Sequence, residues 1–330
     1  MLRIVRVPAD RCKRYHRGRK PLAGPILRHK PRPAEWPTLL LLAATYALWA
    51  LGTTLAWDGS PVLAVLLTAV AVAQHSSLQH EALHGHPFRN EHMDHVLVFL
   101  PLGLVYPYLR FRDTHLAHHH DPILTDPYDD PESNYQDPAV WARMSAPLRA
   151  LLRANNTLLG RMLLGPAIGA VTFIAGDLRA IARGDRRIAL AYALHAAGLA
   201  LLSAWWWAGP GRMPLGAYLL AAYLGGSLLK IRTYLEHRAH EAARARTVII
   251  EDRGPLALLF LNNNLHVVHH SHPQVPWYDL PALYRSNRDH YLRRNEGYLY
   301  RSYGQIFRDH LLKAKDPVPH PVWPVRKRGE

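Results

Sequence analysis

The stretch HVVHH at residues 266–270 determines how this sequence is interpreted, and HLAHH at residues 115–119 repeats its pattern. A third histidine cluster, HEALH at residues 80–84, precedes both. Neutral imidazole is a good ligand for iron, copper, nickel and zinc. Residues three or four apart share one face of a helix, so each cluster can offer two histidines to the same metal ion. The three clusters therefore predict a metal site.

The number of histidines in the clusters indicates more than one ion. His115 can pair with His118 or with His119, and His266 with His269 or with His270. Histidine is abundant here, with 22 in 330 residues, but abundance does not explain two copies of H-x-x-H-H beside an H-x-x-x-H. The clusters contain eight histidines, more than the four ligands of one tetrahedral zinc site, which favours two ions. The eight are His80, His84, His115, His118, His119, His266, His269 and His270.

Composition limits the class of protein and the kind of metal ligand. Hydrophobic residues make up 49% of the chain and are gathered in long blocks, and the formal net charge is +15. Such a charge suits nucleic acid or an anionic membrane, and the hydrophobic blocks favour the membrane. Cys12 is the only cysteine, which excludes a disulfide framework and a cysteine-based zinc or iron–sulfur site. Nitrogen and oxygen must hold the metal.

The first two hydrophobic blocks predict a hairpin of membrane-spanning helices. Residues 36–57 carry no charge and begin and end with tryptophan, as in an aromatic belt. Residues 58–61, Asp-Gly-Ser-Pro, predict a tight turn. A span of about 20 residues that begins at Pro61 ends at His80. The first cluster is therefore expected where the second helix leaves the membrane.

Two later blocks predict a second hairpin, residues 188–208 and 214–235, joined by a turn at residues 208–211. A span of about 20 residues from Pro214 ends at Tyr234. Four spans then return all histidine clusters to the same side of the membrane. The basic N-terminal residues identify that side as the cytoplasm by the positive-inside rule.

Two further apolar segments, residues 96–109 and 162–176, are predicted to lie in the membrane plane or to re-enter it. A span at 96–109 would put the second cluster on the opposite side from the first. A span at 162–176 would expose a group of arginines on the outside, against the positive-inside rule. Prolines and glycines suit breaks in both segments, at Pro101, Pro107, Gly165, Pro166 and Gly169.

The ends of the chain differ in composition from its middle. Residues 1–35 are rich in lysine and arginine and predict a basic cytoplasmic arm, without the aromatic support of a nucleic-acid-binding arm. Residues 36–285 form the predicted membrane domain. Residues 286–330 predict a basic interfacial region, followed by a flexible tail from Asp316.

With these clusters in place, the chain resembles the membrane fatty acid desaturase superfamily over about residues 36–285. The matching text reads HEALHGHP from residue 80, HLAHHHDP from 115 and HHSHPQVPWYDLP from 269. The last of these is similar to bacterial desaturases and to carotenoid ketolases of the same superfamily. The resemblance implies an all-α integral membrane fold of four transmembrane helices in two hairpins, with a cytoplasmic histidine-rich cap and interfacial helices. It also implies a di-iron site and a ninth histidine ligand, for which His237 ranks before His240.

The resemblance implies an O2-dependent enzyme that uses two iron ions, Fe2+/Fe3+, to introduce a double bond into a fatty acyl chain. No heme, flavin or cysteine motif occurs, so an external donor such as a ferredoxin or reductase must supply electrons. The alternative is hydroxylation or ketolation of a carotenoid or other lipid. A metal transporter is disfavoured because its ligands would lie near the bilayer midplane. The expected location is a bacterial inner membrane, with both termini and the metal site cytoplasmic.

Residues beside the clusters are candidates to orient the ligands, because metal-bound imidazoles usually donate their second N–H to a carboxylate or carbonyl. The asparagines at 262–264 either orient the third cluster or end a helix. The acidic candidates are Glu81, Asp113, Asp121 and Glu236. The histidines expected to take no part are His75, His86, His92, His95, His120 and His272.

Overall fold

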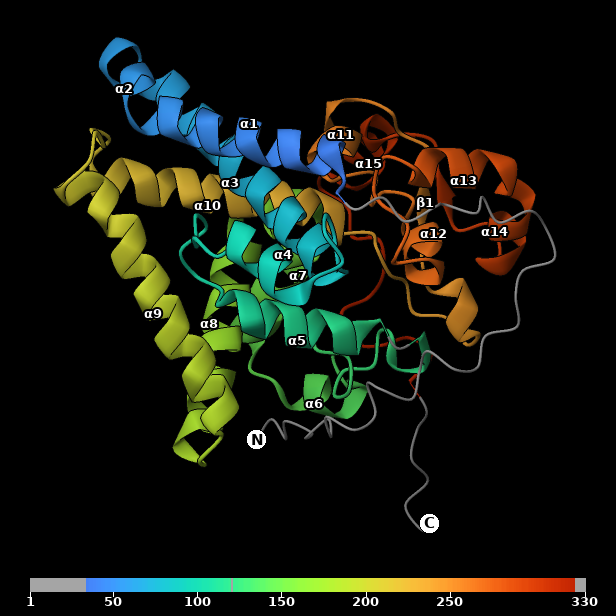
Figure 1. Ribbon diagram of the computed structural model, residues 1–330. Coiled ribbons are helices and arrows are strands. Elements are labelled where there is room, and N and C mark those ends of the chain that lie inside the picture. The colour runs from blue at the N-terminus through green and yellow to red at the C-terminus, as the bar shows by residue number, and fades with distance from the viewer. Residues whose placement is uncertain (1–33, 120, 324–330) are drawn as a thin grey trace.

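The computed structural model describes residues 34–119 and 121–323 (Figure 1). This part of the chain is mostly helical, and its one sheet is a parallel pair of two-residue strands, β1 (Ile249–Ile250) and β2 (Leu299–Tyr300). The all-α prediction is confirmed. Most of the predicted basic arm lies outside the described residues.

The first hairpin forms where the uncharged blocks predict it. Helix α1 (Trp36–Thr53) continues through the short α2 (Leu55–Gly59) and turns at Ser60 into α3 (Pro61–Leu83). Ser60 caps α3, since its Oγ accepts from the N–H of Leu63. A Cβ on Gly52 would lie 2.4 Å from Thr68 Oγ1, so glycine is required where α1 and α3 approach each other.

Four helices are long and apolar enough to cross a membrane: Trp36–Gly59, Pro61–Leu83, Leu158–Ala182 and Arg186–Trp207. The number agrees with the prediction, but one member differs. Helix α8 (Leu158–Ala182) qualifies, and α10 (Leu215–Thr233) does not, because Lys230 and Arg232 lower its hydropathy. The predicted breaks in 162–176 are wrong, since α8 is continuous through Pro166. Tyr223 donates a hydrogen bond to the carbonyl of Leu163 in the adjoining turn.

Hydrogen bonds join both ends of α8 to other elements of the fold. The N–H of Leu159 donates to the carbonyl of Leu311 over 2.9 Å. Near the other end, Asp177 accepts two hydrogen bonds of 2.8 and 2.9 Å from Arg110, on the helix that carries the second cluster. The in-plane orientation of α8 stays a prediction, because α8 is also long and apolar enough to cross a membrane.

Helix α9 (Arg186–Trp207) and α10 form the second hairpin, and α10 packs along α3. A Cβ on Gly225 would lie 2.7 Å from Val72, which shows how closely these two helices approach. The turn after α9 lies beside the turn of the first hairpin, because the N–H groups of Arg212 and Met213 both donate to Thr53 O. Figure 1 shows α2 and the α9–α10 turn at the same end of the molecule.

The segment 98–107 forms no helix, which agrees with the prediction that it does not span the membrane. It follows α4 (Glu91–Leu97) and packs between helices. Tyr218 donates to Leu102 O over 2.9 Å, and His195 Nε2 donates to Leu104 O over 2.9 Å. Side chains on α9 and α10 thus satisfy backbone carbonyls of a non-helical segment between the helices.

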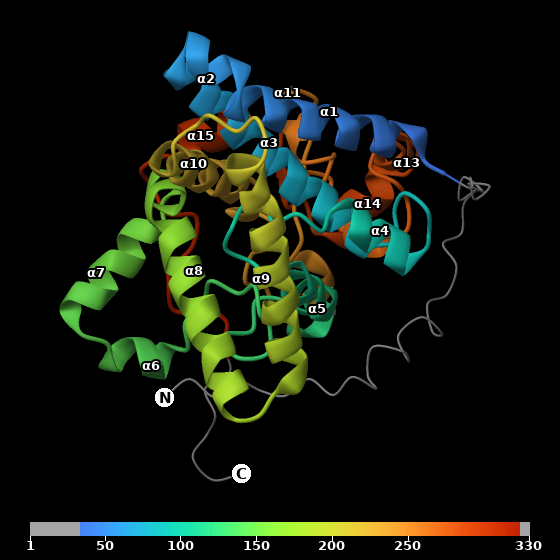
Figure 2. The same ribbon diagram turned by 60° about the vertical axis from the view of Figure 1, so that its left-hand side comes forward.

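The histidine clusters lie away from these turns, on α3, α5 and α12. Figure 2 shows the helices from a second side. Helix α5 carries the second cluster and α12 the third, while α7 is amphipathic. The remaining bounds are α5 Tyr108–His118, α6 Pro138–Arg143, α7 Ala146–Asn155, α11 Pro255–Leu259, α12 His266–Ser271, α13 Leu280–Ser286, α14 Arg288–Arg294 and α15 Tyr303–His310, with 3-10 turns at Asp121–Ile123 and Ala243–Ala245.

The predicted flexible tail is wrong for residues 316–323. Gln136 N donates to Val318 O over 2.9 Å, and His320 N donates to Gln136 O over 2.8 Å. His320 is buried and its Nε2 lies 3.2 Å from Thr125 Oγ1. These backbone bonds fix the segment although its proline-rich composition suggested disorder. Residues 324–330 lie outside the described part of the chain.

Reporters inserted in the turns test this topology. We expect a reporter at Gly59 or Gly211 to face the outside and one at Gly184, between α8 and α9, to face the cytoplasm. Gly184 is a suitable insertion site because a Cβ there would meet no atom within 4 Å. An outside signal at Gly184 with a cytoplasmic signal at Gly211 would mean that α8 spans the membrane and α10 does not.

Candidate metal centre

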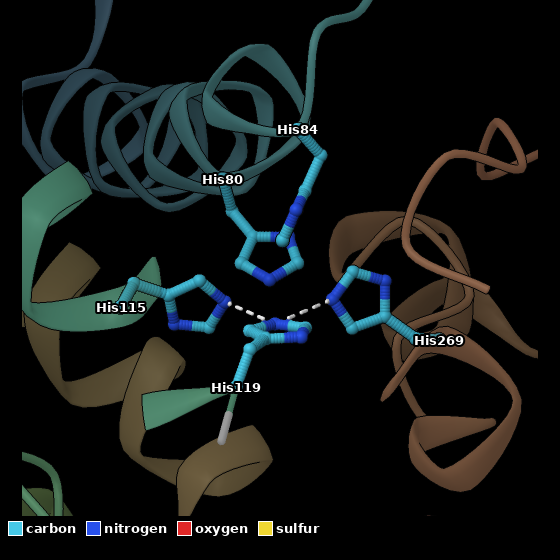
Figure 3. Close-up of side chains that lie close together, drawn as sticks. All are labelled: His80, His84, His115, His119 and His269. Carbon is cyan, nitrogen blue, oxygen red and sulfur yellow. Dashed lines mark hydrogen bonds between the residues drawn. The ribbon is translucent and has the colours of Figure 1, made fainter. Parts of the chain in front are cut away.

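Five histidines from three helices converge in a first group. His80 and His84 lie one turn apart at the end of α3, where the helix stops at Leu83. His115 and His119 come from α5 and its C-cap, and His269 comes from α12. One ligand nitrogen of each lies within 4.8 Å of all the others. Figure 3 shows the five rings pointing into a common space.

Four more histidines form a second group: His118, His237, His266 and His270. His237 follows the end of α10, and its Nε2 lies 2.8 Å from His118 Nε2 and 3.2 Å from His266 Nε2. The structure places His237 in this group and leaves His240 out of it. His240 Nε2 instead lies 3.5 Å from a carboxylate oxygen of Glu296.

The structure shows which histidines of each cluster lie together. His119 joins His115 in the first group, while His118 turns to the second. His270 joins His266 in the second group, while His269 turns to the first. The two groups are neighbours, because the rings of His119 and His270 stack with centroids 4.2 Å apart. Helices α5 and α12 therefore each supply both groups.

The asparagines before α12 orient the third cluster. Asn264 Nδ2 donates to Ile250 O over 2.6 Å, and Asn262 Nδ2 donates to Trp277 O over 3.0 Å. Asn263 Oδ1 lies 2.9 Å from His266 Nδ1. Leu261 and Asn262 adopt positive φ angles of 52° and 55°, a tight turn that these side-chain bonds hold. All three asparagines therefore position the segment that enters α12.

Burial keeps most of these imidazoles neutral. It lowers the pKa of His84, His119 and His237 well below the ordinary histidine value, and neighbouring imidazoles lower these pKa values further. The same causes lower the pKa of His266, His269 and His270. A neutral imidazole has a free lone pair, as a metal ligand requires.

Orphaned nitrogen atoms fit the same interpretation. Nε2 of His80 and Nε2 of His84 are buried and have no hydrogen-bond partner among the described residues. An unpartnered buried polar atom is costly unless a ligand satisfies it. A donor set of nine imidazoles without a thiolate suits a transition metal such as iron. The residues present therefore fit two neighbouring metal ions.

Two carboxylates that the sequence analysis did not single out hold the second cluster. His118 Nδ1 lies 2.7 Å from Asp130 Oδ1, and His115 Nδ1 lies 2.9 Å from Glu132 Oε1. Burial lowers the pKa of His118, but Asp130 and Glu132 outweigh it and raise the pKa to about 9. In the sequence, the only sign of these partners is the acidic composition of the loop after α5. No spacing rule links its carboxylates to particular histidines.

The acidic candidates have different roles. Glu236 lies near His266, 3.8 Å from its Nδ1, and accepts from Asn263 Nδ2. Glu81 instead accepts from Trp277 N over 2.7 Å, and Asp113 pairs with Arg112 and Arg187, so neither bonds a group histidine. The side chain of Asp121 and all of His120 lie outside what the structure describes. The other expected bystanders belong to neither group. Among them, His86 Nδ1 lies 2.7 Å from Glu35.

The comparison with protein families gives one result. The family model described as Fatty acid desaturase matches residues 57–303, which is most of the chain and includes all nine grouped histidines. No curated protein matches the sequence.

Proposed function

The chain belongs to the fatty acid desaturase family, and from that premise we propose that it introduces a double bond into a fatty acyl chain with two iron ions and O2. Family membership and the four apolar helices make it a membrane oxidoreductase that acts on lipids, of the desaturase or hydroxylase type. The observation that carries the finer proposal is the pair of adjoining histidine groups.

In this proposal each histidine group holds one iron ion. The first ion would bind to His80, His84, His115, His119 and His269, and the second to His118, His237, His266 and His270. Bound iron would supply the power to activate O2 and to break an unactivated C–H bond, which no protein side chain has. An imidazole set leaves iron free to alternate between its ferrous and ferric states.

The surrounding residues orient the ligand rings and join the segments around them. Asp130, Glu132 and Asn263 each accept an N–H from a ligand ring, which fixes its orientation. Trp277 lies in the segment after α12. Its backbone N–H donates to Glu81 on α3, and its Nε1–H donates to Thr38 on α1. These bonds join the segment after α12 to α3 and to α1.

The reaction requires components beyond this chain. Forming an alkene from two adjacent CH2 groups with O2 removes one hydrogen from each and releases two waters. It also needs two electrons and two protons from outside the substrate. An external donor such as a ferredoxin or reductase supplies the electrons. We place the site and both termini in the cytoplasm of a bacterial inner-membrane protein. Residues 36–285 form the catalytic domain, between the basic arm of residues 1–35 and the C-terminal region of residues 286–330.

Metal analysis and product analysis test the proposal together. Protein purified from iron-replete cells is expected to hold two iron ions per chain, and membranes that contain it are expected to produce an unsaturated acyl chain, detected by mass spectrometry. A product that is an alcohol or ketone would identify the hydroxylase or ketolase alternative. One iron per chain, or zinc in place of iron, would contradict the di-iron proposal.

A further inference from the structure

Helices α13 and α14 cover the helix that carries the third histidine cluster. Val267 and Val268 of α12 belong to one buried cluster with Leu283 and Tyr284 of α13 and Tyr291 of α14. Tyr291 is fully buried. The outer surface of these two helices is therefore separated from α12 by a single layer of side chains.

This outer surface, here called the α13–α14 face, is basic. Residues 285–294 contain four arginines and one aspartate, and Arg285, Arg288 and Arg293 are exposed. Arg288 pairs with Glu251 over 2.7 Å. Arg285 and Arg293 form no ion pair or hydrogen bond through their guanidinium groups with another described residue, so their charge is available to an outside partner.

Aromatic rings connect the α13–α14 face to the metal centre. His290 is partly exposed on α14, and its ring centroid lies 5.4 Å from that of Tyr291. Tyr291 in turn lies 6.2 Å from the ring of His272, which caps the C-terminus of α12. His272 is two residues from His270. The rings of His290, Tyr291 and His272 thus form a continuous series from the surface to the end of the third cluster.

The position of the face suits a soluble partner. Figure 1 shows α13 and α14 at the end of the molecule opposite α2 and the α9–α10 turn. Since α3 and α10 run from those turns toward the histidines, a bilayer around them leaves the α13–α14 face in water. A basic face accessible from water and close to the metal centre attracts an acidic partner by electrostatic complementarity.

We propose that the α13–α14 face is the docking surface for an acidic one-electron carrier, of the iron–sulfur ferredoxin class. The inference rests on the proposed function, which requires an external electron donor. In each encounter the reduced carrier would give up one electron and be oxidised, and iron held by the two histidine groups would accept that electron. No bond is formed or broken in this step, and Arg285 and Arg293 contact acidic side chains of the carrier.

Charge reversal tests the docking surface by binding. The full-length protein in lipid nanodiscs is titrated with an acidic [2Fe–2S] ferredoxin at low ionic strength. The double variant Arg285→Glu/Arg293→Glu is expected to bind roughly tenfold more weakly, because both attractive charges become repulsive, and the difference should shrink as salt screens it. The matched control is Arg143→Glu/Arg183→Glu, which reverses two exposed arginines on α6 and after α8. The control should bind within about twofold of the parent.

The proposal is overturned if both double variants weaken ferredoxin binding equally, or if neither weakens it. It is also overturned if the parent protein binds anionic lipid vesicles through this face but does not bind ferredoxin. Product formation separates this inference from the proposed function. With ferredoxin as donor, the Arg285→Glu/Arg293→Glu variant should lose roughly tenfold in product, whereas a small chemical reductant should restore it to the parental level. A parent that makes no unsaturated product with either donor contradicts the proposed function, while the binding result still decides the docking surface.

Discussion

Replacing His237 by Ala should abolish product formation and lower the bound iron from two ions per chain to one or fewer. His237 Nε2 lies 2.8 Å from His118 Nε2 and 3.2 Å from His266 Nε2, so its loss removes one of four ligands of the second group. The remaining three cannot close the gap without moving α5 or α12. Loss of a residue that merely orients a ligand costs about 10- to 100-fold, so the loss of a ligand should cost at least about 100-fold.

His240→Ala is the matched control, because it removes the same side chain three residues along the chain. His240 is partly exposed and faces Glu296, so iron content and turnover should stay at the parental level. The measurements are bound iron and unsaturated product per chain in intact membranes. Insertion should be unchanged in both variants, since the apolar helices supply the membrane affinity. An active, iron-replete His237→Ala protein would exclude His237 as a ligand.

The same loss is expected for the other grouped histidines. Each contributes one nitrogen to a set whose members come from different helices, so no neighbour can replace it. His75→Ala is the control for this series, because His75 bonds Tyr46 and lies in neither group. If several of these variants kept activity, the metal centre would not be at this position.

Asp130→Asn should weaken iron binding by about 10- to 100-fold without preventing folding. Asp130 Oδ1 lies 2.7 Å from His118 Nδ1, and both side chains are buried. The change keeps the size of the side chain but replaces the charge that fixes the ring of His118. Since one amide oxygen remains to accept a hydrogen bond, the loop that Asp130 also supports through Thr125 N should persist.

Refilling the chelated protein with ferrous iron measures this effect as an affinity. The neighbouring exposed residue provides the control, and Asp129→Asn should bind iron like the parent. Glu132→Gln should weaken the first group in the same way, because Glu132 bonds His115. A parental affinity in Asp130→Asn would mean that the carboxylate stabilises the loop but does not contribute to the metal centre. If Asp130→Asn lost iron affinity only in proportion to a loss of thermal stability, the conclusion would be the same.

Hydrophobic pattern and helix length were enough to predict the first hairpin and α9. The membrane imposes these features locally, because about 20 apolar residues are needed for each crossing. The same reasoning failed at α8. Gly165 and Pro166 indicate a break, but α8 is continuous through both, with Tyr223 of α10 bonded to the carbonyl of Leu163 in the preceding turn.

The prediction of a flexible tail after Asp316 failed for a related reason. Its composition resembles that of a disordered segment, yet backbone bonds to Gln136 fix it against the loop that carries Asp130. Composition describes the tendency of a segment by itself. It does not report a partner more than 150 residues away, which only the folded chain supplies.

The sequence by itself determined that the first histidine cluster lies at a helix end, and helical spacing limited which histidines of a cluster share a face. It did not determine the division into two groups. His118 and His119 are adjacent but serve different groups, because successive residues on a helix point about 100° apart and the partners on each side come from α3, α10 and α12. The choice of His237 over His240, and of Asp130 and Glu132 as the partners of His118 and His115, likewise depended on how distant segments pack. Spacing specifies which residues share a face, and tertiary packing decides what that face meets.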